Sequence, residues 1–213
     1  MLAEFPEVVI VGEAGEVEEA QRKIEDLAPA LLFLDIQMPG GSGFDLLARL
    51  EQVPQVVFTT AYDAHAVRAF EVNALDYLLK PIAPQRLAEA LSRVRSASTP
   101  PAPDGHLEQL FIRDGSHCWF APLKEIRLFT AEGNYVRVSW RKIKPLLGRS
   151  LLSVERRLDP KRFFRANRRQ IVNLDLIESV DMGIGGRLHA GLDDGSEIEI
   201  SRRQARLFKS QAR

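Results

Sequence analysis

A proline-rich stretch in the middle of the sequence constrains the architecture of this chain more than any other feature. Residues 96–105 read SASTPPAPDG, with three prolines among small residues. Proline lacks a backbone N–H and disfavours the helical conformation of the residue before it, so neither a helix nor a central strand continues through this stretch. We interpret it as an extended linker. The alternative is a long loop inside one compact domain. We therefore predict a first domain over 1–95, a linker over 96–106 and a second domain over 107–213.

The two predicted domains differ in charge. The chain of 213 residues holds 29 basic and 29 acidic residues, for a net charge of zero. Residues 1–95 hold 8 basic against 15 acidic residues (−7), which leaves 21 basic against 14 acidic residues (+7) in the remainder. Such an asymmetry indicates two domains with different partners, the basic one a candidate for binding a polyanion. The alternative is uneven surface charge with no partner.

Composition excludes several classes of protein. A hydrophobic content of 45% and a charged content of 27% are ordinary for a globular chain. No apolar run approaches the roughly 18 residues that span a bilayer, and the start MLAEFPEVV lacks the layout of a signal peptide. The single cysteine, Cys118, excludes an intramolecular disulfide and fits a reducing compartment. We expect a cytoplasmic protein without a membrane partner.

Short apolar runs alternate with helical periodicity before the linker. Alternation of this kind, with strands apolar on both faces, predicts a parallel sheet covered by helices on each side. The expected strands are 8–12, 31–35, 55–61 and 76–81, and the expected helices are 16–28, 43–52, 62–74 and 84–95.

The pattern after the linker is different. Many short strands separated by Gly- and Asp-containing turns predict a small antiparallel β domain. The expected strands are 110–113, 118–122, 125–133, 135–140, 170–174, 177–182, 187–192 and 196–201, and the one expected helix is 150–158.

Three polar residues end successive apolar runs of the first domain: Asp35, Thr60 and Lys80. The carboxyl ends of parallel strands meet at one edge of a sheet, so these side chains converge. A carboxylate nucleophile beside a hydroxyl and an ammonium that bind phosphoryl oxygens suits phosphoryl transfer. The alternative is that each residue only caps its strand end.

The motifs LLFLDIQMPGGSGFDLL, VVFTTAYDAHAVRAF and NALDYLLKPI resemble the receiver domain of bacterial two-component response regulators. The resemblance implies a doubly wound α/β fold, with Asp35 as phosphoacceptor, Thr60 as switch hydroxyl, Lys80 as phosphate-binding lysine and Tyr77 as switch aromatic. It also implies a Mg²⁺ ion held by Asp35 and a backbone carbonyl of the residues that follow it.

One departure from the receiver pattern concerns the metal. Receivers hold Mg²⁺ with an acidic pair after a first strand, and no such pair follows an apolar strand before Asp35. Hard divalent cations need several oxygen ligands, so we expect an incomplete metal site and exposed apolar strand edges. A truncated start and a natural loss of the first strand both remain open. A phosphatase of the haloacid-dehalogenase type would need a second aspartate at position 37, where this chain has Gln37, so we expect no enzyme.

The basic domain contains the cluster KRFFRANRRQ over 161–170. The stretches EIRLFTAEGNYVRV, LLSVERRLDPKRFFRANRRQIVNLDLIESVD and GSEIEISRRQ resemble the LytTR-type DNA-binding domain, in which loops between strands enter successive major grooves. The resemblance implies base contacts from Arg168 and Arg202 and phosphate contacts from Lys161, Arg165 and Arg169. The remaining implied contact residues are Asn134, Tyr135, Asn167 and Arg203.

Both resemblances together imply a transcriptional response regulator. Its expected partners are a sensor histidine kinase, double-stranded DNA with paired repeats, and a second copy of the chain. The alternative is a regulator that binds DNA or docks to a protein without phosphorylation.

Overall fold

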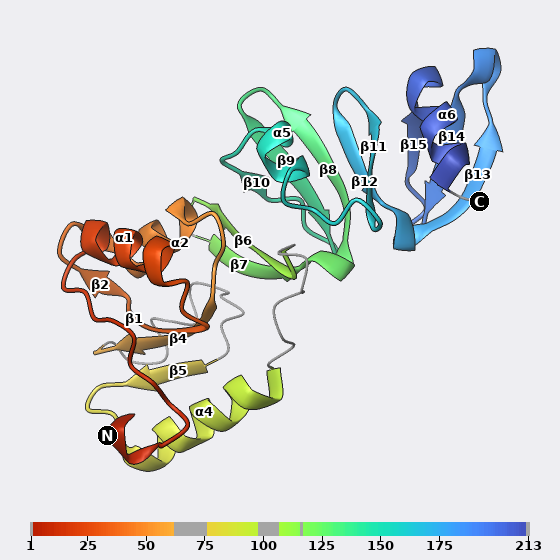
Figure 1. Ribbon diagram of the computed structural model, residues 1–213. Helices are drawn as coiled ribbons and strands as arrows, with labels where there is room; N and C mark the ends of the chain where they lie inside the picture. Colours follow the sequence, from red (N-terminus) through yellow and green to blue (C-terminus); the bar gives the residue numbers. More distant parts are fainter. Residues whose placement is uncertain (1, 62–75, 98–106, 116, 212–213) are drawn as a thin grey trace. The chain divides into compact units, whose positions relative to one another are not determined.

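The computed structural model describes residues 2–61, 76–97, 107–115 and 117–211. The chain forms two compact units, one made of residues 1–100 and 110–120 and the other of residues 101–109 and 121–213 (Figure 1). No helix within the described ranges is long and apolar enough to cross a membrane.

The first unit is built on a three-stranded parallel sheet. Its strands are β1 (Leu31–Asp35), β4 (Gln55–Thr60) and β5 (Asp76–Leu79), in the order β1-β4-β5. The predicted parallel sheet is thus confirmed. The other elements are η1 (Leu2–Glu4), α1 (Val17–Leu27), β2 (Gln37–Met38), β3 (Gly41–Ser42), α2 (Gly43–Arg49) and α4 (Pro84–Ala97). The predicted helix 62–74 lies outside the described residues.

Apolar side chains cover both faces of this sheet. On one face, α1 and α2 pack in a cluster that contains the fully buried Phe58 of β4. On the other face, α4 packs against the fully buried Val57, together with Phe5 and Val8 from the start of the chain. Because neighbouring residues of a strand point to opposite faces, the run Val56–Val57–Phe58 supplies both clusters. These helices therefore hold the carboxyl ends of the strands in fixed positions.

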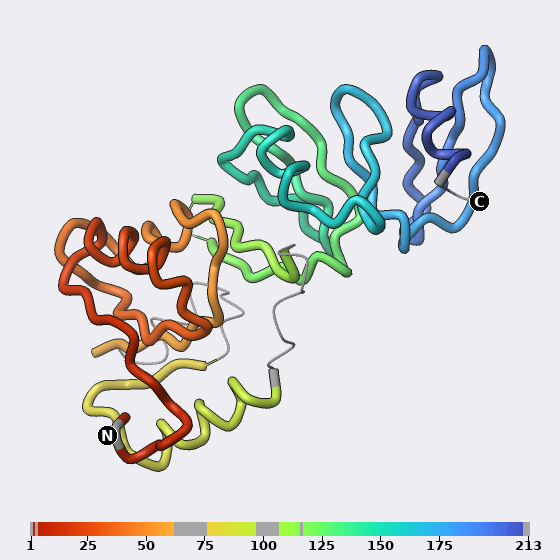
Figure 2. The backbone as a smooth tube through the Cα atoms, in the orientation of Figure 1, coloured from red at the N-terminus to blue at the C-terminus, as the bar shows by residue number. Residues whose placement is uncertain are grey.

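The predicted strand 8–12 is wrong: these residues follow an irregular path, as the backbone trace shows (Figure 2). A strand needs a neighbour to pair its backbone groups, and the described β1 pairs only with β4.

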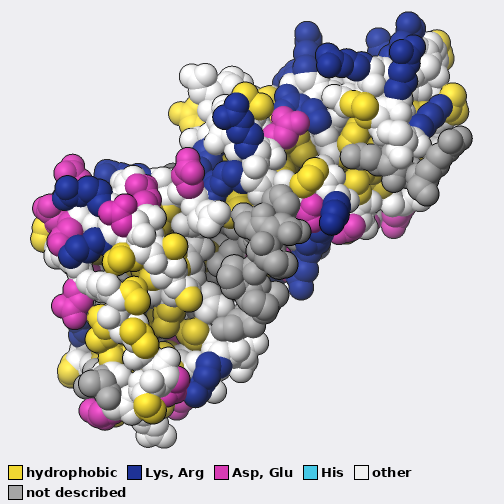
Figure 3. Space-filling model, in the orientation of Figure 1, with side chains coloured by type: hydrophobic (Ala, Val, Ile, Leu, Met, Phe, Trp, Pro, Cys, Tyr) yellow, Lys and Arg dark blue, Asp and Glu magenta, His cyan; other side chains and the backbone are white. Residues whose placement is uncertain are grey.

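A groove of about 850 Å³ lies between residues 8–12 and β1, and both segments line it. Val9 is 78% exposed. Figure 3 shows hydrophobic side chains gathered on the visible face of this unit.

A β-hairpin that follows the linker groups with the first unit. Its strands are β6 (Gln109–Asp114) and β7 (His117–Pro122). Phe111, Cys118 and Phe120 join the cluster around Phe58. Arg113 forms an ion pair with Asp45 of α2, so the hairpin is attached by apolar packing and by charge.

The second unit is mostly antiparallel β structure, as predicted. One sheet has the order β10-β9-β8-β12-β11 and a second has the order β13-β14-β15. Its strands are β8 (Ile126–Glu132), β9 (Tyr135–Trp140), β10 (Leu146–Leu147), β11 (Phe163–Asn167), β12 (Gln170–Asn173), β13 (Ile177–Met182), β14 (Leu188–Leu192) and β15 (Glu197–Ile200). Its helices are η2 (Leu123–Glu125), α5 (Leu151–Glu155), η3 (Leu174–Leu176), η4 (Ile184–Gly186) and α6 (Arg202–Gln211).

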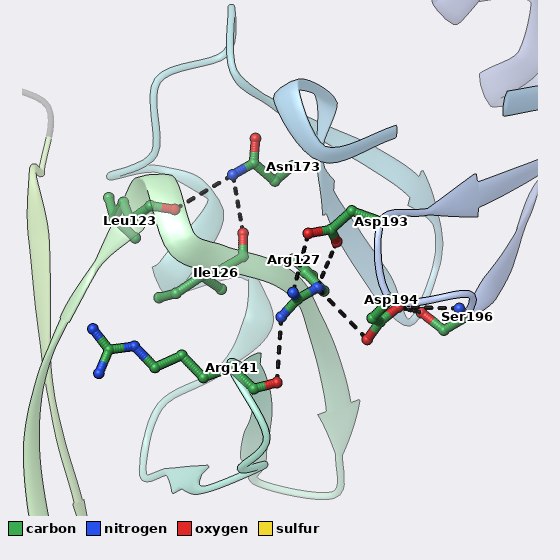
Figure 4. Close-up of polar contacts among 8 residues, drawn as sticks. All are labelled: Leu123, Ile126, Arg127, Arg141, Asn173, Asp193, Asp194 and Ser196. Atoms are coloured by element: carbon green, nitrogen blue, oxygen red, sulfur yellow. Dashed lines mark hydrogen bonds and ion pairs between the residues drawn. The ribbon is translucent and has the colours of Figure 1, made fainter. Parts of the chain in front are cut away.

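Two polar side chains brace the second unit (Figure 4). Arg127 of β8 is bound through Nε and Nη2 to the carboxylate of Asp193, at 2.5 and 3.0 Å, which ties the first sheet to the β14–β15 turn. Asn173, fully buried, donates from Nδ2 to the carbonyl oxygens of Leu123 and Ile126 at 3.4 and 3.0 Å. The two bonds of Asn173 give its buried amide group hydrogen-bond partners inside the unit.

The strand β11 and the helix α6 of this unit were not predicted. The helix α6 packs its Phe208 against Phe164 of β11, with ring centroids 5.4 Å apart. The strand β11 alternates buried Phe164 and Ala166 with the half-buried Arg165 and Asn167. The predicted helix 150–158 is shorter in the structure, where Ser150 caps the N-terminus of α5 by accepting from the Ser153 N–H at 3.2 Å.

Candidate functional site

The carboxyl ends of the three parallel strands bring the first group of predicted residues together. Asp35 ends β1, Thr60 ends β4, and Lys80 follows β5. The Lys80 ammonium lies 2.6 Å from Asp35 Oδ2, while Asp35 Oδ1 accepts from the Gln37 N–H at 3.0 Å. Thr60 is buried, and its carbonyl oxygen accepts from the Lys80 N–H at 2.8 Å. The expected convergence of these three strand ends is present in the structure.

The helix α2 fixes the loop beside Asp35. Ser42 Oγ accepts from the Asp45 N–H at 3.1 Å, and Asp45 Oδ2 accepts from the Ser42 N–H at 2.9 Å, which is a capping box. The Ser42 hydroxyl and then Arg113 lower the pKa of Asp45 to about 2. A Cβ on Gly43 would lie 2.9 Å from Leu34 Cγ, so only glycine lets α2 begin this close to β1.

Tyr77 lies on the face of the sheet that the hairpin covers. Its ring stacks on Phe58 at a centroid distance of 5.6 Å, and burial raises its pKa. The neighbouring Asp76, which sequence reasoning did not identify, is buried and pairs with Arg86 and Arg93 of α4 at 3.1 Å each. The sequence offered one signal for this ion-pair cluster, which is an aspartate at the start of an expected strand followed by arginines in the next expected helix.

The residues around Asp35 do not fit a Mg²⁺ ion. The described part of the chain contains no cluster of three or more His, Cys, Asp or Glu side chains. One oxygen of Asp35 already contacts the Lys80 ammonium, and a hard cation needs several oxygen ligands. We therefore derive no step through a metal.

The second group of predicted residues lies along one edge of the second unit. Figure 1 shows the β8–β9 turn, the β11–β12 turn and the start of α6 at the upper edge. The register explains this arrangement, because Gln170 of β12 pairs with Thr130 of β8 and so brings the two turns to the same end of the sheet. The β13–β14 turn is at this edge too, because Met182 pairs with Leu188 and Leu188 with Ile200, beside the start of α6. We call these four segments the turn edge.

Hydrogen bonds join the segments of the turn edge into one row. Ala131 N–H donates to the Arg169 carbonyl at 2.7 Å, which links the first two turns. Ser201 N–H donates to the Ala166 carbonyl at 3.0 Å, and Asn167 Nδ2 donates to the Glu199 carbonyl at 2.7 Å, which links the second turn to the start of α6. The edge is thus a connected surface and not a set of independent loops.

The predicted contact residues fall into two kinds on this edge. Asn134, Tyr135, Arg168, Arg169, Arg202 and Arg203 are exposed. Arg165 instead turns inward: it donates to the carbonyl oxygens of Asn167 and Arg168, at 2.7 Å each, and pairs with Glu155 at 2.5 Å. Arg165 therefore braces the β11–β12 turn, and its guanidinium is already occupied.

Lys161 is not brought to the turn edge. It precedes β11, whereas the turn that carries Arg168 follows β11. A strand rises about 3.3 Å per residue, so β11 separates Lys161 from Arg168 by roughly its full length. The Lys161 N–H donates to Asp159 Oδ1 at 2.8 Å, in the turn before the strand. The sequence placed Lys161 and Arg168 in one cluster, and folding separates them.

Comparisons with known proteins agree with both halves of this description. The family pattern for the response regulator receiver domain matches residues 2–92, and the pattern for the LytTr DNA-binding domain matches residues 116–213. An uncharacterized response regulatory protein of Vibrio cholerae is 32% identical over 98% of this chain and 90% of its own length. The sensory transduction protein LytT of Bacillus subtilis is 31% identical over 93% and 86%. The transcriptional regulatory protein BtsR of Escherichia coli is 31% identical over 98% and 90%.

Proposed function

Because this chain belongs to the response regulators that join a receiver domain to a LytTr DNA-binding domain, we propose that it binds duplex DNA through the turn edge. It is a DNA-binding regulator of a two-component system and not an enzyme. We assign the receiver-like domain to 1–95, the linker to 96–106 and the DNA-binding domain to 107–213, although residues 110–120 of this last range pack with the first unit.

The observation that supports this proposal is the set of exposed arginines on the turn edge. Its hydrogen-bonded row presents Arg168 and Arg203, whose side chains have no ion-pair partner among the described residues. Two acidic side chains of this row are already paired with arginines: Glu132 with Arg137 at 2.5 and 2.6 Å, and Glu199 with Arg187 at 2.7 Å. Arginine reads guanine edges in the major groove and grips phosphates. We assign Arg168 to a base, Arg169 to a phosphate, and Asn134, Tyr135 and Arg203 to the same face of the duplex.

We propose that Asp35 accepts the phosphoryl group in the pattern of this family, with a sensor histidine kinase as donor. Lys80 would hold a phosphoryl oxygen, because its ammonium already contacts the Asp35 carboxylate. Thr60 and Tyr77 would change position in response. Dimerisation would then raise avidity for two DNA repeats without new base contacts.

A second candidate is DNA binding that does not depend on phosphorylation. The described residues contain no cluster of three or more His, Cys, Asp or Glu side chains that could hold the metal ion used by the family, and this favours the second candidate. Under this alternative the receiver-like unit serves as a docking surface for a protein partner.

Selection of bound duplexes from a random DNA library with the intact chain tests the proposed function. We expect enrichment of one motif, in two copies on the same duplex. Affinity for the enriched duplex should fall linearly with the logarithm of salt concentration, as expected when cations of the protein neutralise phosphates. Equal affinity for every duplex, or no binding at moderate salt, would contradict the proposal.

A further inference from the structure

The β13–β14 turn carries the most exposed large hydrophobic side chain of the described residues. Ile184 is 96% exposed, and Gly183, Gly185 and Gly186 surround it in the sequence. Exposure of one hydrophobic side chain assigns no role by itself, because isolated examples are ordinary on protein surfaces. The residues around Ile184 therefore have to show which partner its side chain could contact.

Arg202 holds this turn in place. Its Nε donates to the Gly185 carbonyl oxygen at 2.7 Å. Gly185 and Gly186 have φ values of 71° and 79°, in the left-handed region that favours glycine. A Cβ on Gly185 would lie 3.3 Å from Arg202 Nη2, so the turn backbone and the guanidinium lie directly against each other. Ile184 is therefore presented by a turn that is fastened to the first residue of α6.

The same turn continues the proposed DNA surface. The start of α6 is bonded to β11 through Ser201 and Ala166, at 3.0 Å, so the β13–β14 turn is the next member of the row. Residues 182–192 contain no acidic residue. The nearby Glu199 pairs with Arg187 at 2.7 Å, and Asp181 lies in β13, before the turn. An exposed apolar side chain beside arginines fits a groove of DNA.

We propose that Ile184 contacts the C5 methyl group of a thymine in the major groove, and that Arg202 is the positioning residue that holds Ile184 there. Thymine is the base that presents a methyl group in this groove, so an apolar tip distinguishes it from the other bases. Arg202 thereby acquires a role other than the base contact expected from the sequence. The inference rests on the proposed DNA binding by the turn edge.

Replacement of thymine by deoxyuridine tests this contact, because it removes only the methyl group. Each thymine of the selected duplex is replaced in turn, and affinities are measured for the wild type, Ile184→Ser and Arg202→Met. At one position we expect deoxyuridine to weaken wild-type binding about fourfold, the effect of losing one buried methyl-sized group. The ratio of the dissociation constants for the deoxyuridine and the thymine duplex should therefore be about four in the wild type and about one in Ile184→Ser. It should also fall to one in Arg202→Met, although loss of a general phosphate contact would leave the ratio unchanged.

The control is Leu152→Ser, which replaces an exposed leucine of α5 and should keep the wild-type ratio. Sedimentation of the free Ile184→Ser chain shows whether Ile184 instead contacts a second copy. A selected duplex whose thymine-to-deoxyuridine ratios do not depend on residue 184 would overturn the inference and leave DNA binding intact. A change in oligomeric state without a change in those ratios would also overturn it. Failure to select any duplex would contradict the proposed function as well.

Discussion

The Lys80 ammonium lies 2.6 Å from Asp35 Oδ2, at the carboxyl edge of a parallel sheet. The pair neutralises the carboxylate, and no cluster of further carboxylates accompanies it in the described residues. A divalent cation would have to compete with the ammonium for Asp35. The ammonium therefore lies where it could hold an oxygen of a phosphoryl group on Asp35, and it already contacts one of the two oxygens that Asp35 could offer to a cation.

We expect this chain to take up little phosphate from acetyl phosphate in the presence of Mg²⁺, because the ion lacks oxygen ligands beside Asp35. Intact mass measured at short times after mixing gives the phosphorylated fraction, with Asp35→Asn as the control. Stoichiometric, acid-labile labelling that disappears in Asp35→Asn would refute the expectation.

Asp45 is expected to stabilise the fold above acidic pH. Its pKa falls from 3.8 to about 2 on folding. The hydrogen bond from the Ser42 hydroxyl is the larger cause, and the contact with Arg113 is the smaller one. Because the folded pKa is the lower one, the stabilisation is fully present above the unfolded pKa and is lost as pH falls through the folded value. A carboxyl titration by nuclear magnetic resonance should show a midpoint near 2, raised more by Ser42→Ala than by Arg113→Met. A wild-type midpoint at the ordinary value would show that neither contact forms.

Cys118 is expected to react slowly with thiol reagents. It is 1% exposed, and burial raises its pKa to about 11, so at pH 8 only about one thiol in a thousand is the reactive thiolate. Labelling of the native chain should be far slower than labelling in urea. Arg113→Glu places two negative charges together at Asp45 and should accelerate labelling. The control is Arg95→Glu, which places two negative charges together at Glu7, the ion-pair partner of Arg95, and should not accelerate it. Fast labelling of the native wild type would mean that the hairpin is not packed on the first unit.

Asn173→Ala is expected to lower the free energy of unfolding of the second unit by about 1–3 kcal/mol, because it removes two hydrogen bonds that are buried in the native structure. The matched control is Asn134→Ala, an exposed position, which should change stability by less than about 0.5 kcal/mol. Urea unfolding followed by the fluorescence of buried Trp140, in a Trp119→Phe background, gives both values. Equal stability of the two variants would argue that the Asn173 amide is not needed.

The pattern of apolar residues within a segment was sufficient to predict the strands of the parallel sheet. The apolar runs that end at Asp35 and Thr60 predicted the parallel sheet and the meeting of its polar strand ends. The strand 8–12 failed because strand formation depends on a pairing partner, which no local pattern encodes. The strand β11 was missed because its cations in KRFFRANRRQ indicated only a charged cluster. The spacing of Ala205 and Phe208 was a weak signal for α6.

The turn edge depends on strand register, so strand spacing alone did not predict it, and its contact residues were expected only from the family resemblance. Arg165, Arg168 and Lys161 are close in the chain, yet Arg165 folds inward, Arg168 is exposed at the turn, and Lys161 lies at the other end of β11. Which of them can reach DNA follows from the direction of one strand. The part played by the β13–β14 turn also required the contact between Arg202 and Gly185.

The most direct test of DNA binding by the turn edge compares Arg168→Ala with Lys161→Ala, two single-charge losses on either side of β11. Affinity for the selected duplex is measured by fluorescence anisotropy at several salt concentrations. We expect Arg168→Ala to weaken binding by about 1–3 kcal/mol and to relax sequence preference, as for a lost base contact. Lys161→Ala should bind as the wild type does. Equal losses for the two variants, or a larger loss for Lys161→Ala, would contradict the assignment of DNA binding to this edge.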